Sequence, residues 1–230
     1  MIEYETSITA HSGADHTPDN SIEFVRYALE SDADILEVDV RRDAKHDELV
    51  LSHDEVGGEL LTLEQAFQLL AGHPSMQINC DLKEAGLEEP VYRLAEQMQL
   101  SDRLIFSGSV DPERAAQVLG QKREKIYLNM EEQIPDLYQN CQQDSAYART
   151  AAERICTICE AYGIKTVNVY EGLVDDRFLE IMNRHKIFLS VWTVNEERRL
   201  AYFLSRGVYN ITTRRLKAAL FMRRKRGGLS

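Results

Sequence analysis

The sequence of 230 residues lacks any apolar run of the length that a membrane span requires. Its first residues, MIEYETS, also lack the basic and then apolar order of a secretory leader. We therefore expect no stable membrane insertion, and we take the cytoplasm as the default compartment.

Positive charge is the minority charge in this chain. Lysine and arginine together number 27, against 38 aspartate and glutamate residues, which gives a formal net charge of −11. A surface of that sign repels a phosphate backbone, so the composition disfavours a general nucleic-acid-binding protein. A small anionic substrate is still compatible with it, because such a molecule responds to the local field of its site.

Cysteine is scarce, with four residues in all. Cys156 and Cys159 form a C-x-x-C motif, but it lies in an expected helix, with no second pair and no preceding strand. A zinc site or a thioredoxin-like motif needs that context. We expect Cys156 and Cys159 to be buried, unreactive thiols, and Cys80 and Cys141 to be free.

No linker, low-complexity tract or long repeat divides the chain, which predicts a single domain over residues 1–230. Short β-branched runs alternate with helical patterns from end to end. The expected strands are Ser7–Ala10, Ile35–Val40, Met76–Lys83, Arg103–Ser109, Lys125–Met130, Thr166–Tyr170, Phe188–Val194 and Val208–Thr213, with an extra short strand at Glu48–Ser52. The expected helices are Ser21–Ser31, Leu63–Ala71, Leu87–Gln99, Pro112–Gly120, Ser145–Tyr162, Val174–Arg184, Glu196–Ser205 and Arg215–Arg224.

Strict alternation of strand and helix favours a parallel sheet. Eight such units in 230 residues match a (β/α)8 TIM barrel, the α/β fold that we predict. A doubly wound open sheet is the alternative, but it usually begins with a glycine-rich turn, and none is present. Ser21, Asp111 and Asn195 stand where N-terminal caps of three of the helices are expected.

Two carboxylates share one face of the expected second strand. Glu37 and Asp39 are spaced i, i+2 in the apolar segment ILEVDV, so their side chains project to the same side. Like charges repel strongly in apolar surroundings, so a positive group should lie between them. The simplest candidate is a divalent metal ion.

Further polar residues fall at the ends of other expected strands, where βα barrels carry their working residues. The candidate set is His11, Glu37, Asp39, His53, Asp81, Lys83 and Trp192. Three carboxylates suit a hard cation such as Mg²⁺ or Ca²⁺, two imidazoles can serve as general acid and base, and a lysine can stabilise charge on a phosphoryl group. This combination is suited to displacement at phosphorus in a phosphodiester.

Each candidate also has an ordinary structural explanation. A single histidine at a strand end is usually just hydrogen-bonded. Asp81 and Lys83 could pair with one another, and the only tryptophan, Trp192, could belong to the core. The remaining histidines, His16, His46, His73 and His185, are assigned to the surface.

The order of these motifs resembles a known family. The segments are His11-Ser12-Gly13, Pro18-Asp19-Asn20-Ser21, Ala33-Asp34-x-x-Glu37-x-Asp39-Val40, His53-Asp54, Asp81-x-Lys83, Val191-Trp192-Thr193-Val194-Asn195 and Gly207-Val208. They resemble the H-R-G, P-E-N-T, G-A-D-x-x-E-x-D-V, H-D, E-x-K, V-W-T-V-N and G-V-D-G-I-x-T-D motifs of the glycerophosphodiester phosphodiesterases.

The resemblance implies a (β/α)8 barrel that hydrolyses glycerophosphodiesters to an alcohol and glycerol phosphate with a divalent cation. Carried over by position, His11 and His53 would be the acid–base pair. The metal ligands would be Glu37, Asp39 and Asp81. Lys83 would contact the phosphate of a small-molecule phosphodiester substrate, and Trp192 would line its pocket. The related phospholipase D toxins also have Asp in place of Glu before x-Lys.

Several positions depart from the family pattern. Ser12 stands where the family has an arginine, which removes a guanidinium that would neutralise the phosphate. Arg41 or Arg42, just past the ligand strand, is a candidate replacement. Tyr209 and Arg214 stand where the family has small or acidic residues.

Two other functions stay open at this point. The loss of the arginine at Ser12 is compatible with a catalytically impaired protein that binds metal and phosphodiester without turnover. A barrel enzyme acting on phosphorylated sugars would need a glycine-rich phosphate cradle at the last strands, and Gly207 followed by Tyr209-Asn210 makes a poor one.

Overall fold

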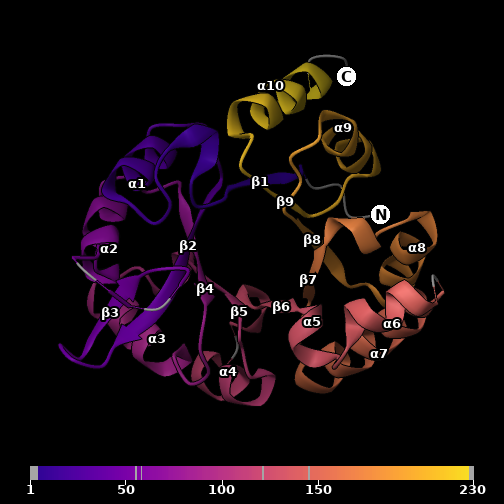
Figure 1. Cartoon of the computed structure of the whole chain (residues 1–230), viewed down its shortest axis with the longest axis horizontal. Coiled ribbons are helices and arrows are strands. Elements are labelled where there is room, and N and C mark those ends of the chain that lie inside the picture. The colour runs from indigo at the N-terminus through magenta and orange to yellow at the C-terminus, as the bar shows by residue number, and fades with distance from the viewer. Residues whose placement is uncertain (1–4, 55, 58, 121, 145, 228–230) are drawn as a thin grey trace.

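The strands of the computed structural model, which describes residues 5–54, 56–57, 59–120, 122–144 and 146–227, form a ring with the helices outside it (Figure 1). The bounds of the eight parallel strands are β1 Ser7–Ala10, β2 Ile35–Asp43, β4 Gln77–Leu82, β5 Leu104–Gly108, β6 Tyr127–Asn129, β7 Thr166–Tyr170, β8 Phe188–Trp192 and β9 Asn210–Thr213. Strand β3, Glu48–Leu51, pairs with β2 in the antiparallel sense.

The strand order closes the ring. It runs β5-β4-β2-β1-β9-β8-β7-β6, and a parallel bridge between Phe106 and Ile126 joins β5 to the start of β6. The predicted (β/α)8 TIM barrel is therefore confirmed.

The helices cover the outer face of the ring (Figure 1). Their bounds are α1 Ile22–Leu29, α2 Leu63–Ala71, α3 Glu88–Gln97, α4 Pro112–Leu119, α5 Met130–Gln133, α6 Leu137–Gln143, α7 Tyr147–Tyr162, α8 Asp176–His185, α9 Glu197–Arg206 and α10 Leu216–Gly227. Among the described residues, no helix combines the length and hydropathy that crossing a bilayer requires.

Two of the three expected caps form. The Ser21 hydroxyl accepts a hydrogen bond from the Phe24 amide, and the Asp111 carboxylate accepts two from the first turn of α4. The expectation for Asn195 was wrong, because the cap residue of α9 is Glu196. The Asn195 side chain instead accepts a hydrogen bond from the Arg214 amide across the barrel rim.

The main difference from the sequence analysis lies between β6 and α7. The expected strand Lys125–Met130 is only Tyr127–Asn129, since Met130 already begins α5. Helices α5 and α6 were not expected at all; both are short and lack a side-chain cap, so their sequence signal is weak. Ser145, the expected start of the next helix, lies outside the described residues.

The inside of the barrel has an apolar floor and a polar upper part. Ile35, Ile105 and Tyr127, each near the start of its strand, form a small buried cluster with Tyr209 packed against it. The Tyr209 ring also stacks on Phe188 at 4.8 Å between ring centroids. Tyr209 thus belongs to the floor, at the opposite end from the strand termini that carry the predicted site.

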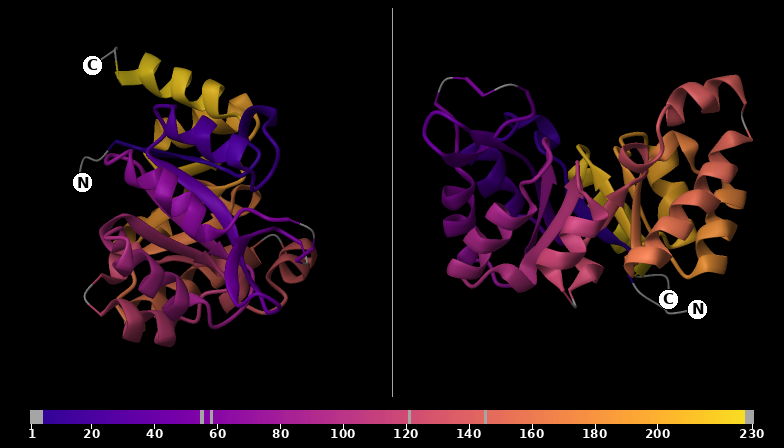
Figure 2. Two further views of the ribbon diagram at one scale, coloured as in Figure 1. Left: turned by 90° about the vertical axis from the view of Figure 1, so that its left-hand side faces the viewer. Right: turned by 90° about the horizontal axis from the view of Figure 1, so that it is seen from below.

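Above this floor, inward positions alternate with the apolar positions that face the helices, as a period of two requires. The buried inward residues are mostly polar: Glu37, Asp39, Asn79, Ser107, Asn129, Asn168, Ser190, Asn210 and Thr212. At the same end of the barrel, the β3 hairpin and α6 rise on opposite sides of the mouth (Figure 2).

Candidate active site

A cavity of about 340 Å³ lies at the carboxyl ends of the strands. Six of the seven predicted site residues line it: His11, Glu37, His53, Asp81, Lys83 and Trp192. The seventh, Asp39, is buried beside it, with 2% of its surface exposed. The structure therefore brings residues from β1, β2, β4, β8 and the loop after β3 to one end of the barrel.

The three carboxylates face one another across two paired strands. The register places Asp39 opposite Asp81 and Glu37 opposite Asn79, so all three point to the same side. One oxygen from each carboxylate lies within 4.8 Å of the others. Such a cluster of hard oxygen donors has the chemistry that Mg²⁺ or Ca²⁺ prefers.

Lys83 partly neutralises the cluster. Its Nζ lies 2.7 Å from Asp39 Oδ1 and forms a second, shorter ion pair with Asp81. Burial would lower the pKa of Lys83, but the charges of Asp81 and Asp39 raise it above its usual value. Burial would also raise the pKa of Asp39, yet the charge and hydrogen bond of Lys83, with a hydrogen bond from Asn20, hold it below its usual range. The structure thus contains the pairing of Asp81 with Lys83 that the sequence analysis considered, and Lys83 also pairs with Asp39.

In the described residues, Glu37 is the carboxyl group of the cluster that forms no ion pair with Lys83. Its Oε2 accepts a hydrogen bond from the Ser12 amide at 3.0 Å. Burial raises the pKa of Glu37 well above its usual value, and the negative charges of Asp39 and Asp81 raise it further. A divalent cation bound by the three carboxylates would stabilise the ionised form of Glu37, so the residues present fit such an ion.

His11 lies at the edge of the carboxylate cluster. Its Nδ1 is 3.8 Å from Glu37 Oε2, 2.8 Å from the Ser12 carbonyl oxygen and 3.2 Å from Arg214 Nε. Burial lowers the pKa of His11; the contact with the Ser12 carbonyl opposes this change, and the charge of Arg214 adds to it. The ring is therefore biased toward its neutral form.

His53 is much more open. Its side chain is 64% exposed, and its Nδ1 lies 3.1 Å from Asp54 Oδ1. The ring also borders a second hollow of about 560 Å³ that Asp19, Ile22 and Gln65 help to line. His53 thus stands between the polar cavity and an open groove toward α1 and α2.

Neither arginine considered as a replacement at position 12 lines the cavity in the described part of the chain. Arg41 donates two hydrogen bonds to the His53 carbonyl oxygen, and Arg42 pairs with Asp47 on the β2–β3 hairpin. Ser12 itself is fully buried, and its hydroxyl accepts a hydrogen bond from the Asn20 amide. These contacts do not support the hypothesis that Arg41 or Arg42 compensates for Ser12, and it stays a prediction.

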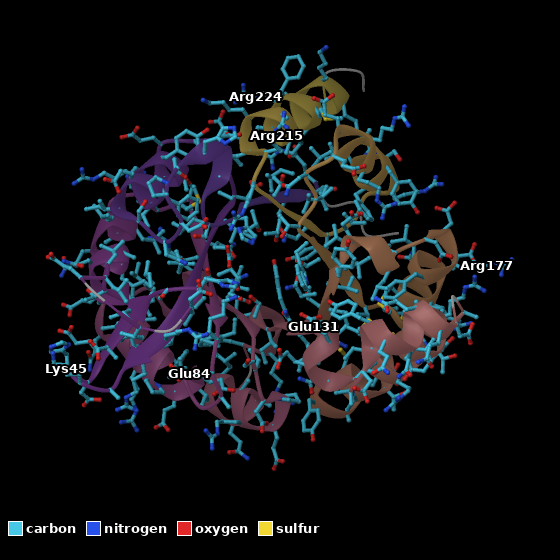
Figure 3. The ribbon with its side chains drawn as sticks, viewed as in Figure 1. Lys45, Glu84, Glu131, Arg177, Arg215 and Arg224 are labelled. Atoms are coloured by element: carbon cyan, nitrogen blue, oxygen red, sulfur yellow. The ribbon has the colours of Figure 1, made fainter. Side chains whose placement is uncertain are left out.

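The sequence analysis missed a chain of polar groups on the far wall. Asn168 Nδ2 donates to Asn129 Oδ1 at 2.9 Å, and Asn129 Nδ2 donates to Glu131 Oε1 at 2.7 Å. Burial raises the pKa of Glu131 to about 7. Figure 3 shows Glu131 near the barrel axis, whereas Arg177 and Lys45 lie at the outer rim. An asparagine inside an otherwise apolar strand is the signal that predicts this wall.

Trp192 completes the cavity with an aromatic wall. Its ring centroid lies 6.0 Å from that of Tyr170, which lies 6.0 Å from that of Tyr138 on α6. The buried Trp192 Nε1 has no hydrogen-bond partner within the described ranges. The position of Trp192 in the lining fits a pocket wall better than a core role.

No protein-family model matches the chain, and a search of curated proteins finds no match. Solved structures with the same fold do match. A glycerophosphodiester phosphodiesterase from Parabacteroides distasonis has 16% identity and a TM-score of 0.73, with 97% of this chain and 98% of that chain covered. A phosphodiesterase from Oleispira antarctica in complex with its product sn-glycerol-3-phosphate has 15% identity and a TM-score of 0.70, with 95% and 96% covered.

A glycerophosphodiester phosphodiesterase from Thermotoga maritima has 19% identity and a TM-score of 0.60, with 95% of this chain and 98% of that chain covered. At such identities the likeness establishes a shared fold over nearly the whole chain. The chemistry has to be argued from the residues in the cavity.

Proposed function

We propose that this protein is a metal-dependent hydrolase of glycerophosphodiesters or closely related phosphodiesters, which yields an alcohol and glycerol phosphate. The observation that supports this most strongly is the single cavity lined by His11, His53, Lys83 and two of the three clustered carboxylates. The fold shared with phosphodiesterases, one of them with sn-glycerol-3-phosphate bound, supports the same substrate class. The proposed compartment is the cytoplasm.

Glu37, Asp39 and Asp81 would hold the divalent cation, Mg²⁺ or Ca²⁺. When bound, it would offset the charge of the phosphodiester and of the pentavalent transition state. Lys83, already between Asp39 and Asp81, would add a fixed positive charge toward the phosphate. Trp192 would bound the substrate on the side of β8.

His11 and His53 would divide the proton transfers. One imidazole withdraws the proton from the attacking oxygen. The other protonates the alkoxide oxygen as its bond to phosphorus breaks. Two separate proton carriers meet this need because one proton must be taken up and another delivered in the same displacement. Water as the attacking group gives glycerol phosphate directly, whereas attack by the neighbouring hydroxyl of the glycerol gives a cyclic glycerol phosphate that water opens in a second displacement.

His11→Ala and His53→Ala test the assignment. Each substitution is expected to lower turnover of glycerophosphodiesters by about 10²-fold or more, the range for loss of a general acid or base, while circular dichroism stays unchanged. His46→Ala is the matched control, since His46 pairs with Asp43 on the exposed hairpin. Unchanged turnover in both site variants would refute the assignment.

A second candidate function is binding without turnover. It is favoured by Ser12, whose buried hydroxyl offers no positive charge. Purified protein assayed with Mg²⁺ and with Ca²⁺ across diesters that differ in the alcohol separates the two. Release of an alcohol that stops on addition of EDTA would exclude the binding-only function.

The phosphorylated-sugar alternative has little support. Gly207 is the left-handed C-terminal residue of α9 and precedes β9, so it lies at the floor end of the barrel. It is therefore remote from the carboxyl ends of the strands, where such a cradle would have to form.

A further inference from the structure

We infer that Arg214, which directly follows β9, is the anion-binding guanidinium of this site and contacts the phosphate. Ser12, in the loop after β1, offers no positive charge. The inference rests on the proposed function and names a residue that binds its substrate.

Arg214 is not among the described residues that line the cavity, but the barrel register places it beside His11, which does line it. Strands β1 and β9 are parallel neighbours with Ala10 opposite Thr213, so the next residue of each strand emerges at the mouth side by side. The Arg214 amide donates to Asn195 Oδ1 at 2.9 Å, and its carbonyl oxygen accepts from the Asp15 amide at 2.8 Å. The backbone of Arg214 is thus fixed on both sides.

The side chain of Arg214 is held only by weak or replaceable partners. Its Nη2 lies 3.1 Å from Oδ1 of Asp19, but the two side chains are 42% and 51% exposed. An ion pair with that exposure contributes little. Its Nε lies 3.2 Å from His11 Nδ1, which is also 2.8 Å from the Ser12 carbonyl oxygen.

These two contacts of His11 Nδ1 exclude one another. To bond the Ser12 carbonyl the nitrogen must carry a proton, and to accept from Arg214 Nε it must not. Whenever the ring donates to Ser12, the Nε–H of Arg214 loses its acceptor. A phosphate is anionic, which a neutral imidazole is not, and it can accept two hydrogen bonds from one guanidinium.

The charge of the cavity also favours a guanidinium. Its charged lining residues other than the histidines are Glu37, Asp81, Glu131, Glu132 and Lys83. The single ammonium is already paired with Asp39 and Asp81. The divalent cation of the proposed function, together with Lys83, would balance the charge of the three carboxylates. A phosphodiester monoanion would then still gain from a positive charge beside His11, and the planar fork of an arginine matches two phosphate oxygens.

The two departures from the family pattern complement each other. Position 12 has lost an arginine, and position 214 has gained one where the family has an acidic residue. The two positions follow the paired strands β1 and β9, so a guanidinium at position 214 lies beside the loop that carries Ser12.

Arg214→Gln and Arg214→Lys test the inference, with Arg215→Gln as the control. Arg215 is an exposed neighbour with the same charge that lies beside α10 (Figure 3). Each enzyme is assayed for kcat, KM and competitive inhibition by inorganic phosphate. Arg214→Gln is expected to raise KM and the phosphate inhibition constant by about 10- to 100-fold, the range for a lost charge-assisted hydrogen bond, with kcat changed less than about threefold. Arg214→Lys should recover part of this loss, and Arg215→Gln should match wild type.

A KM and inhibition constant within twofold of wild type in Arg214→Gln would overturn the inference. So would a fall in kcat alone, because that result makes Arg214 a positioning residue for His11. If wild-type protein hydrolyses no diester, the proposed function fails, and calorimetric titration of inorganic phosphate with Mg²⁺ still decides the inference. Binding weakened only by the Arg214 substitutions supports it, and equal binding, or none by wild type, contradicts it.

Discussion

Lys83 Nζ lies 2.7 Å from Asp39 Oδ1, joining the end of β4 to the middle of β2 beneath the cavity. The Asp39 side chain is 3% exposed and that of Lys83 is 20% exposed. The pair therefore connects the stability of the barrel with the charge of the candidate metal site.

Lys83→Met should destabilise the metal-free protein by about 2 to 4 kcal/mol, because the buried Asp39 carboxylate loses its main counter-charge. A divalent cation restores positive charge, so Mg²⁺ or Ca²⁺ should raise the Tm of this variant more than that of wild type. Thermal melts with and without metal measure both effects. Equal metal-induced shifts in the two proteins would contradict this role of Lys83.

Glu37→Gln should stabilise the metal-free protein relative to wild type at pH values above the unfolded pKa of glutamate, about 4.3, while abolishing its response to metal. The folded-state pKa of Glu37 is raised by burial, so the folded protein holds a proton that the unfolded chain releases. That contribution is present below the unfolded pKa and is lost as pH rises through the folded pKa. The amide introduced by the substitution does not titrate, so the variant escapes this loss. Urea unfolding at pH 5 and pH 8, with and without metal, checks it; a variant that still gains stability from metal contradicts it.

Glu131→Gln should remove a separate pH dependence. Burial raises the pKa of Glu131 to about 7, so wild-type stability should fall between about pH 4.5 and 7 by about 2 to 3 kcal/mol relative to the variant. The amide carbonyl oxygen of the variant can still accept the hydrogen bond from Asn129. Unfolding titrations across that range measure the difference, with the exposed neighbour variant Glu132→Gln as control. Parallel wild-type and Glu131→Gln curves would be inconsistent with a buried, partly protonated carboxyl.

The thiols of the native protein should react unequally with a disulfide reagent. Burial raises the pKa of Cys156 and of Cys159 to about 12, so little thiolate forms at pH 8. Cys80 is also fully buried, whereas Cys141 is partly exposed. We expect one thiol, that of Cys141, to react in the folded state and four in denaturant. Rapid labelling of Cys156 or Cys159 in the native protein, read by mass spectrometry, would contradict their burial.

Local sequence pattern predicts the barrel well, because each βα unit carries its own period and turn signals. The convergence of His11, Asp81 and Trp192 follows from the rule that parallel strands end at one rim. The i, i+2 spacing also correctly places Glu37 and Asp39 on one inward face.

Contacts between distant side chains could not be predicted in this way. Arg214 meets His11 only because β9 pairs with β1, a relation between the two ends of the chain that no local pattern carries. Arg41 was expected near the phosphate because of its sequence position, yet it folds back onto the His53 carbonyl. Helices α5 and α6 were not predicted because they are short and lack side-chain caps. Glu131 was not predicted as a site residue because it lies in α5.

The most direct test of the proposed activity is ³¹P NMR of a glycerophosphodiester incubated with the purified protein. With Mg²⁺ or Ca²⁺ present, the diester resonance should be replaced by that of glycerol phosphate, and EDTA should stop the conversion. A diester resonance that persists unchanged with either cation, across diesters with different alcohols, would contradict a metal-dependent hydrolase built from His11, His53 and the three carboxylates.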